Sequence, residues 1–293
     1  MKKVAIITGV TSFLGKSTAK YLLSKGFIVF GIVRPDSTRK ENIKNIRGLN
    51  IIESDFDTLT KDDFDEFINA HSDKEFKDIK KADITFIHFA WGATLDRSNF
   101  MMQMLNVDYS MKVLKFAKIM KVRRFIFAGS QAEYSDTAYG MAKKKFADEA
   151  VKSLKDTDIN FIHFRIFSIY GKDDRENSLI KELARCLRSN TNIDLSSCNY
   201  KWNFLFIDDF VSIVYGFIEN DAHADTYDIA SDDTRLLKEY CISAKEALKS
   251  KAKLRFGARL DSIETFAIPN IRKLKSIMPD ITFTKFEKGI KTI

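Results

Sequence analysis

With 293 residues, the chain is long enough to form one domain or two closely packed ones around a sizeable core. Hydrophobic residues make up 45% and charged residues 30% of the sequence, a balance that excludes an intrinsically disordered protein. The net charge of +8 arises from 48 basic and 40 acidic residues that are interleaved along the chain, which argues against a nucleic-acid-binding face.

The cysteines and the apolar stretches argue against further classes of protein. Cys186, Cys198 and Cys241 are odd in number and widely separated, so they indicate neither a disulfide framework nor a metal site. No apolar run approaches the roughly 20 residues of a membrane span, and the run after Met-Lys-Lys is too short for a signal peptide. We therefore expect a cytoplasmic protein without a bound metal and without a membrane or nucleic acid as partner.

Short apolar runs alternate with amphipathic helical patterns through the first two-thirds of the chain. The expected strands are residues 4–8, 28–33, 49–53, 84–89, 125–128 and 161–166, and the expected helices lie near 14–25, 61–70, 100–120 and 139–154. Strands that are apolar almost throughout and separated by helices predict a parallel sheet covered on both faces. This is a doubly wound α/β fold of the Rossmann type, whose ligands bind at the carboxyl ends of the strands.

The alternation weakens after about residue 168. Helical patterns near 179–187, 209–217 and 236–248 are separated by short strands, and no linker rich in Gly, Pro or Ser divides the two parts. We expect residues 1–168 to form the sheet domain and residues 169–293 a smaller, discontinuous mixed α/β lobe that binds the substrate. The cleft between them is the expected site.

The first expected strand runs directly into the turn Thr8-Gly9-Val10-Thr11-Ser12-Phe13-Leu14-Gly15, and a helix follows. A tight turn at a helix N-terminus presents backbone N–H groups to an anion. Gly9 allows the sharp turn and Gly15 a close helix–sheet contact, while Ser12 stands where a third glycine is usual. The context favours dinucleotide binding over a plain strand–helix turn. The expected cofactor-binding residues here are Gly9, Thr11, Ser12, Phe13, Leu14 and Gly15.

The second expected strand ends at Arg34, with Ser37 and Arg39 close by, and we expect no acid to act at this tip. An acidic residue at this tip would bind the ribose 2′-hydroxyl of NAD, whereas a guanidinium suits the 2′-phosphate of NADP. The sequence therefore favours NADP(H), with NAD(H) possible and a plain surface arginine as the structural alternative.

The expected strand 125–128 leads to Ser130, and Tyr139 and Lys143 follow on a helix. Residues four apart project from one helix face, so Lys143 can stabilise the phenolate of Tyr139 and bring its pKa toward neutrality. Tyr139 can then give or take a proton on a substrate oxygen that Ser130 also contacts. We expect Ser130, Tyr139 and Lys143 to be the catalytic residues of an oxidoreductase.

Over nearly its whole length the chain resembles the extended short-chain dehydrogenases/reductases of the NAD-dependent epimerase/dehydratase family. Besides the turn and the catalytic set, the matching pieces are Asp55-Phe56, His88-Phe89-Ala90-Trp91-Gly92, Asn106, Arg165-Ile166-Phe167-Ser168-Ile169-Tyr170-Gly171 and Trp202–Asp209. The resemblance implies a homodimer built from the helices near 100–120 and 139–154. For His88 and Trp91, ordinary core packing is the open alternative.

The resemblance also implies roles for further residues. It places Asp55 and Phe56 by the adenine, Ala90, Trp91 and Phe167 along the cofactor, and Lys143 on the nicotinamide ribose. It gives contacts with a nucleotide-sugar substrate to Trp91, Gln131, Ser168 and Asn203.

Departures from the family pattern narrow the expected activity. The Asp–Glu pair of the family's 4,6-dehydratases is replaced by Gln131 and Ala132, which cannot eliminate water. The arginine that often grips the substrate phosphate is Asn203, so that role would pass to another cation such as Lys201, Arg175 or Arg185.

The leading hypothesis is NADPH-dependent reduction of the C4 ketone of a nucleotide-linked 4-keto-6-deoxy sugar, as in the synthases of CDP-abequose, CDP-paratose and dTDP-fucose that serve cell-surface polysaccharides. One alternative is a nucleotide-sugar 4-epimerase with tightly bound NAD. Another is a non-catalytic dinucleotide-binding sensor, a class that commonly lacks the Tyr or the Lys.

Overall fold

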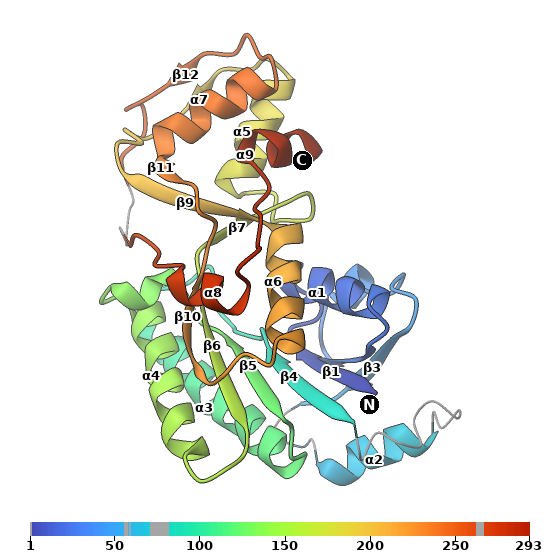
Figure 1. Ribbon diagram of the computed structural model, residues 1–293. Helices are drawn as coiled ribbons and strands as arrows, with labels where there is room; N and C mark the ends of the chain where they lie inside the picture. Colours follow the sequence, from blue (N-terminus) through green and yellow to red (C-terminus); the bar gives the residue numbers. More distant parts are fainter. Residues whose placement is uncertain (1, 56–57, 59, 71–81, 262–266) are drawn as a thin grey trace. The chain divides into compact units, whose positions relative to one another are not determined.

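The computed structural model describes residues 2–55, 58, 60–70, 82–261 and 267–293 (Figure 1). It divides into two compact units, which are described separately. Unit 1 comprises Met1–Arg165 and Val214–Tyr227, and unit 2 comprises Ile166–Ile213 and Asp228–Ile293.

A seven-stranded sheet has the order β10-β6-β5-β4-β1-β2-β3. The neighbouring pairs from β3 to β6 are all parallel, which confirms the doubly wound fold. From β1 the strand order runs to β2 and β3 on one side and to β4, β5 and β6 on the other. Doubly wound sheets bind their ligands at such a reversal of strand order. The strands are β1 (Lys3–Thr8), β2 (Ile28–Val33), β3 (Leu49–Glu53), β4 (Asp83–His88), β5 (Arg124–Ala128), β6 (Asn160–Ile166) and β10 (Asp225–Ile229).

Helices pack on the apolar faces of the sheet. Buried residues of α2 (Lys61–Ala70), α3 (Phe100–Ile119) and α4 (Ala138–Leu154) share one core cluster with the strands. The helices α3 and α4 lie side by side along that face (Figure 1). Elsewhere in unit 1, Tyr21 of α1 (Phe13–Ser24) packs edge-on against Tyr215, with ring centroids 5.9 Å apart. Among the described residues, no helix combines the length and apolarity that a bilayer span requires.

Unit 2 is built from short elements around aromatic side chains. Its three-stranded sheet has the order β11-β9-β7, and β12 pairs with β8. The rings of Tyr170, Phe204, Tyr240 and Phe286 contact one another in its core. The elements are β7 (Ser168–Tyr170), β8 (Ile193–Asp194), β9 (Lys201–Phe206), β11 (Thr234–Leu236), β12 (Leu254–Arg255), α5 (Leu179–Arg188), α7 (Leu237–Ala247), α8 (Arg272–Ile277) and α9 (Phe286–Gly289).

The segment 214–227 belongs to unit 1, whereas the sequence suggested a second lobe that starts at residue 169. It comprises the second half of α6 (Ile207–Glu219) and the start of β10. Phe217 packs on Phe164 of β6 with ring centroids 4.9 Å apart, and on Tyr227 at 4.8 Å. These contacts explain why the segment returns to the large sheet.

Candidate active site

The turn between β1 and α1 requires both of its glycines. Gly9 has φ +68°, and a Cβ there would lie 2.7 Å from the backbone nitrogen of Ala90. A Cβ on Gly15 would overlap the backbone carbonyl of Gly9. The turn is therefore a tight cradle of backbone groups, a shape that fits the pyrophosphate of a dinucleotide.

Ser12 is the N-cap residue of α1. Its Oγ accepts a hydrogen bond of 3.1 Å from the N–H of Gly15. The first-turn N–H groups of Phe13 and Leu14 have no partner within the helix and are the donors that this turn offers to an anion. The neighbouring Thr11 carbonyl accepts a bond from the side chain of Asn42. Contact of these residues with the cofactor remains a prediction.

A buried hydrogen-bond chain fixes the loop after β4. Ser110 Oγ donates to the Asn106 carbonyl, so it accepts from His88 Nε2 at 2.9 Å. His88 Nδ1 is then the acceptor for Thr8 Oγ1 at 2.7 Å, and the Thr8 oxygen accepts from the Ala90 N–H. Burial, and secondarily the charge of Lys143, lower the pKa of His88 to about 3. His88 is a neutral structural link that positions Ala90.

Trp91 forms part of the surroundings of Lys143. The Lys143 Nζ lies 3.9 Å from the centroid of the indole, a close cation–π contact. The indole N–H donates to Gln103 Oε1 at 2.9 Å, and the buried Gln103 amide binds the carbonyls of Ala93 and Asp96. Gln103 thereby holds Trp91 and its loop in place, a role that nothing in the sequence pattern indicates.

Tyr139 and Lys143 lie on the first turns of α4, which Thr137 caps. Lys143 Nζ is 5.7 Å from the centroid of the Tyr139 ring and donates to the Ala128 carbonyl at 2.6 Å. Lys143 is 3% exposed. Burial lowers the pKa of Lys143 to about 7, and the charge of Glu133 opposes this shift. The amine therefore titrates in the range where a proton-transfer site works.

Arg97 is a second cation beside Tyr139 that the sequence reasoning missed. Its guanidinium carbon lies 5.1 Å from the Tyr139 ring centroid, and its carbonyl accepts the Tyr139 N–H at 3.1 Å. The residue belongs to the loop before α3, where no local spacing points to a contact with α4.

Ser130 follows β5 and caps the short helix η3 (Gln131–Tyr134). Its Oγ accepts the Ala132 N–H at 3.1 Å, which leaves the hydroxyl hydrogen available to donate. Glu133 closes the capping box by accepting the Ser130 N–H at 2.8 Å. A Cβ on Gly140 of α4 would overlap the Ala132 carbonyl, so η3 and the start of α4 are packed tightly together. Gln131, an expected substrate contact, opens η3.

The residues expected on the adenine side of the cofactor lie at the carboxyl ends of β2 and β3. Arg34 follows β2, and its side chain is 68% exposed. Asp36 Oδ1 is 3.8 Å from Arg34 Nε, so the expectation that this tip lacks an acid was wrong. Asp55 is half-buried just after β3, and Phe56 lies outside the described residues.

The remaining expected residues belong to unit 2. Phe167 is buried and donates its N–H to the Ile229 carbonyl, and Ser168 begins β7. Asn203 is 2% exposed, and its amide accepts the Ser231 N–H and donates to the carbonyls of Ser231 and Asp233. Protein groups therefore occupy the Asn203 amide, and its role in substrate binding remains a prediction.

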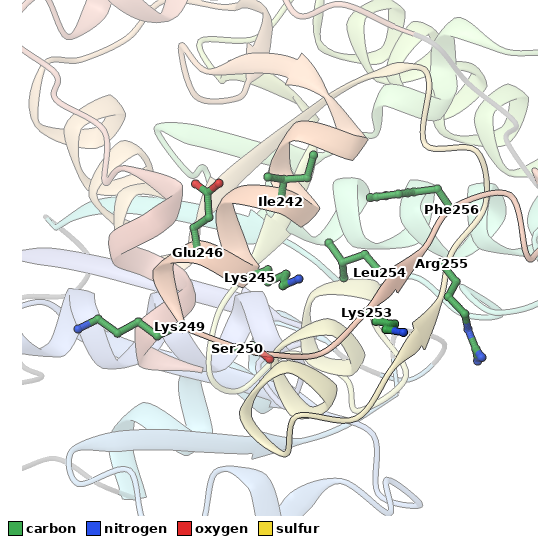
Figure 2. A pocket seen from close by; sticks show the side chains of 9 residues that line it. All are labelled: Ile242, Lys245, Glu246, Lys249, Ser250, Lys253, Leu254, Arg255 and Phe256. Carbon is green, nitrogen blue, oxygen red and sulfur yellow. The ribbon is translucent and has the colours of Figure 1, made fainter.

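Unit 2 also has a surface hollow of about 710 Å³ (Figure 2). It contains none of the residues expected from the sequence. The side chains of Lys249 and Arg255 point in opposite directions (Figure 2). It is lined by Ile242, Lys245, Glu246, Lys249, Ser250, Lys253, Leu254, Arg255 and Phe256.

Comparisons with known proteins agree with this geometry. The model of the NAD-dependent epimerase/dehydratase family matches residues 5–230. The CDP-abequose synthase of Salmonella muenchen is 24% identical, over 88% of this chain and 85% of the relative. The ADP-L-glycero-D-manno-heptose-6-epimerase of Brachyspira hyodysenteriae is 23% identical, over 98% of this chain and 95% of the relative.

Among solved structures, the UDP-N-acetylglucosamine 4-epimerase from Methanobrevibacter ruminantium, in complex with UDP-N-acetylmuramic acid, has the same fold. Its TM-score is 0.80 at 17% identity, and the match covers 100% of this chain and 97% of that one. Since the family model spans well over half of the sequence, the protein belongs to the NAD-dependent epimerase/dehydratase family and is an enzyme of the short-chain dehydrogenase/reductase type.

Proposed function

We propose that the protein reduces the C4 ketone of a nucleotide-linked 4-keto-6-deoxy sugar with NADPH. The observation that carries the proposal is the similarity to CDP-abequose synthase across 88% of the chain, in a protein that also has the Ser130, Tyr139 and Lys143 set. The residues present fit a nicotinamide dinucleotide at the β1–α1 turn, and the bound nicotinamide would supply the hydride.

The side chains of α4 and η3 perform the protein's part of the reaction. Tyr139 donates the proton to the C4 oxygen, and its phenolate is stabilised by the cation of Lys143 beside its ring. Ser130 donates its hydroxyl hydrogen to the same oxygen while its own lone pair is bound to Ala132. These roles require Lys143 to be protonated.

The residues after Ser130 favour reduction over dehydration. Gln131 and Ala132 occupy the positions where elimination of water needs an acid and a base. Neither side chain can exchange a proton near neutral pH. A site of this composition is suited to add a hydride and a proton to a ketone.

A 4-epimerase with tightly bound NAD is the second candidate. Asp36 favours it, because a carboxylate near the tip of β2 can accept a hydrogen bond from the ribose 2′-hydroxyl of NAD. Arg34, exposed at the same tip, favours the 2′-phosphate of NADP and hence the reductase.

We also propose a homodimer in the cytoplasm. Large apolar side chains are exposed along α3 and α4, where the family resemblance implies a subunit interface. The most exposed is Met101 of α3, at 74%. The others are Phe100, Met102, Leu105, Tyr109, Ile119, Met141 and Val151.

The decisive experiment supplies CDP- and dTDP-4-keto-6-deoxyglucose with NADPH or NADH and follows loss of the reduced cofactor. UDP-glucose and UDP-N-acetylglucosamine with NAD test epimerisation in parallel. We expect turnover of a keto sugar with NADPH, and its loss in Tyr139→Phe but not in Tyr109→Phe, a matched change on the exposed face of α3. Epimer formation without consumption of NADPH would contradict the reductase and support the second candidate.

A further inference from the structure

Glu133, which contacts the backbone of Ser130, and His163, which contacts Glu133, are two buried ionisable side chains. The side chains of Glu133 and His163 are 4% and 6% exposed, and Glu133 Oε1 lies 3.1 Å from His163 Nε2. The same carboxylate oxygen accepts the backbone N–H of Ser130 at 2.8 Å. Burial of a carboxylate is unfavourable unless it is paired, so this pair must be maintained against a desolvation penalty.

The Glu133 bond fixes the backbone of Ser130. Ser130 has φ −153° and ψ 149°, and its N–H and Oγ are both tied to η3, through Glu133 and Ala132. With these two bonds in place, the hydroxyl hydrogen is the remaining group of Ser130 that can donate to a ligand. Loss of the Glu133 bond would let the direction of the Ser130 side chain vary.

His163 anchors Glu133 to the sheet. Its Nδ1 lies 3.2 Å from Thr226 Oγ1, and its ring stacks on Phe127 with centroids 5.5 Å apart. A Cβ on Gly129 would overlap both His163 Nε2 and the Glu133 carboxylate. The pair therefore fills the space that a side chain at residue 129 would need, and it has little freedom to move.

We propose that Glu133 is a positioning residue of the reaction, which holds Ser130 in place for the substrate oxygen, and that His163 is its anchor. The inference rests on the proposed function, since it takes Ser130 to be the residue that contacts the substrate oxygen.

The charge of Glu133 has a second effect, at Lys143. Burial lowers the pKa of Lys143, and the Glu133 carboxylate raises it again. Removal of that charge would therefore lower the pKa of Lys143 further. The other titratable or charged groups that interact with these two side chains are His163 on β6, His88 on β4, and Tyr139 and Lys144 on α4.

Two substitutions separate the hydrogen bond from the charge. Glu133→Gln keeps an oxygen acceptor for the Ser130 N–H and loses the charge, whereas Glu133→Ala loses both. We expect Glu133→Ala to lower kcat about 10-fold or more with little change in KM, because the oriented donor is lost. Glu133→Gln should retain most of kcat at low pH, where Lys143 is protonated. Its kcat/KM should begin to fall at a lower pH than in the wild type, because loss of the Glu133 charge lowers the pKa of Lys143.

Glu149→Gln is the matched control, since Glu149 pairs with Lys145 on the surface of α4. Exchange of the Ser130 amide hydrogen is a readout that needs no turnover. It should be faster in Glu133→Ala than in the wild type and remain slow in Glu133→Gln. If Glu133→Ala does not fold, His163→Phe replaces it, since this change keeps the ring stacking and removes the anchor of Glu133. Faster exchange of the Ser130 amide in His163→Phe supports the inference, and exchange as slow as in the wild type overturns it.

The outcomes distinguish this inference from the proposed function. A wild type that turns over no keto sugar overturns the proposed function, and amide exchange still tests the hold on Ser130. An active wild type whose kcat and amide exchange are unchanged in Glu133→Ala overturns the inference alone. An equal loss of kcat in Glu133→Ala and Glu133→Gln would also overturn it, because the hydrogen bond would not be the cause.

Discussion

The burial of Lys143, a residue of the candidate site, lowers the stability of the folded protein. Its amine is buried among Trp91, Phe127 and Tyr139, and an aliphatic cation is costly in such surroundings. The drop in its pKa from 10.5 to about 7 corresponds to at most about 5 kcal/mol. The folded state favours the neutral amine, so the penalty is complete below pH 7 and disappears as pH rises to 10.5.

We expect Lys143→Met to remove this pH dependence together with turnover. The free energy of unfolding of the wild type, measured by urea denaturation, should increase relative to that of Lys143→Met between pH 7 and pH 10.5. A constant difference across that range would show that the amine is not penalised in the folded protein.

His88 affects the free energy of unfolding at acidic pH, whereas Lys143 affects it at alkaline pH. Its pKa is lowered from 6.5 to about 3, first by burial and then by Lys143, so the folded state does not accept a proton that the unfolded chain accepts. Stability should therefore fall as pH decreases from 6.5 to 3, and His88→Gln should show less of this loss. Thermal unfolding of both proteins along a pH series measures the difference. Parallel curves would contradict the assignment of His88 as neutral.

Arg34 controls the choice of cofactor in our proposal. A charge-assisted hydrogen bond contributes about 1.5 to 3 kcal/mol, so Arg34→Asp should reduce the preference for NADPH over NADH by about 10-fold or more in kcat/KM. Asp36→Asn is the comparison: it removes the carboxylate that would favour NAD and leaves the guanidinium, so the preference for NADPH should not fall. An unchanged ratio in Arg34→Asp would remove the argument for NADP.

At the scale of elements, the β1–α1 turn depends on close backbone contact. Gly15 lies within α1, where alanine has the higher helix propensity, so only the overlap with the Gly9 carbonyl opposes a Gly15→Ala change. We expect Gly15→Ala to destabilise the protein by about 1 to 3 kcal/mol and to weaken dinucleotide binding, as measured by calorimetry. Gly26→Ala is the control, since a Cβ there meets nothing within 4 Å and only its φ of +81° is strained. Equal binding by the two variants would contradict this account.

The sequence allowed most elements of the large sheet to be predicted, because the strands from β1 to β6 are short, mainly apolar runs and helical patterns separate all of them except β2 and β3. The strand β10 was missed, since Asp225–Ile229 mixes polar and apolar residues and its place depends on pairing with the distant β6. The pattern at Ser130 and Glu133, a serine followed three residues later by a glutamate, could have indicated the capping box. The contact of Glu133 with His163 could not be predicted, because it depends on how β5 and β6 pair.

At the scale of the whole molecule, the exposed apolar side chains of α3 and α4 support the proposed dimer. We expect Leu105→Glu to shift the protein from dimer to monomer in light scattering, because a buried carboxylate would be unpaired at that surface. Leu260→Glu is the control, since Leu260 of unit 2 is 94% exposed and lies outside this surface. A dimer that tolerates Leu105→Glu would place the interface elsewhere.

The cap at the start of α1 has a consequence for the rate at which the nucleotide exchanges. The Ser12 hydroxyl already accepts the N–H of Gly15, so we expect a bound diphosphate to rely mainly on the N–H groups of Phe13 and Leu14. With fewer donors to the diphosphate, we expect a shorter residence time of the dinucleotide. An enzyme that consumes a fresh reductant in every cycle benefits from rapid departure of the spent one, whereas a catalyst that returns its hydride to the same sugar gains nothing from it.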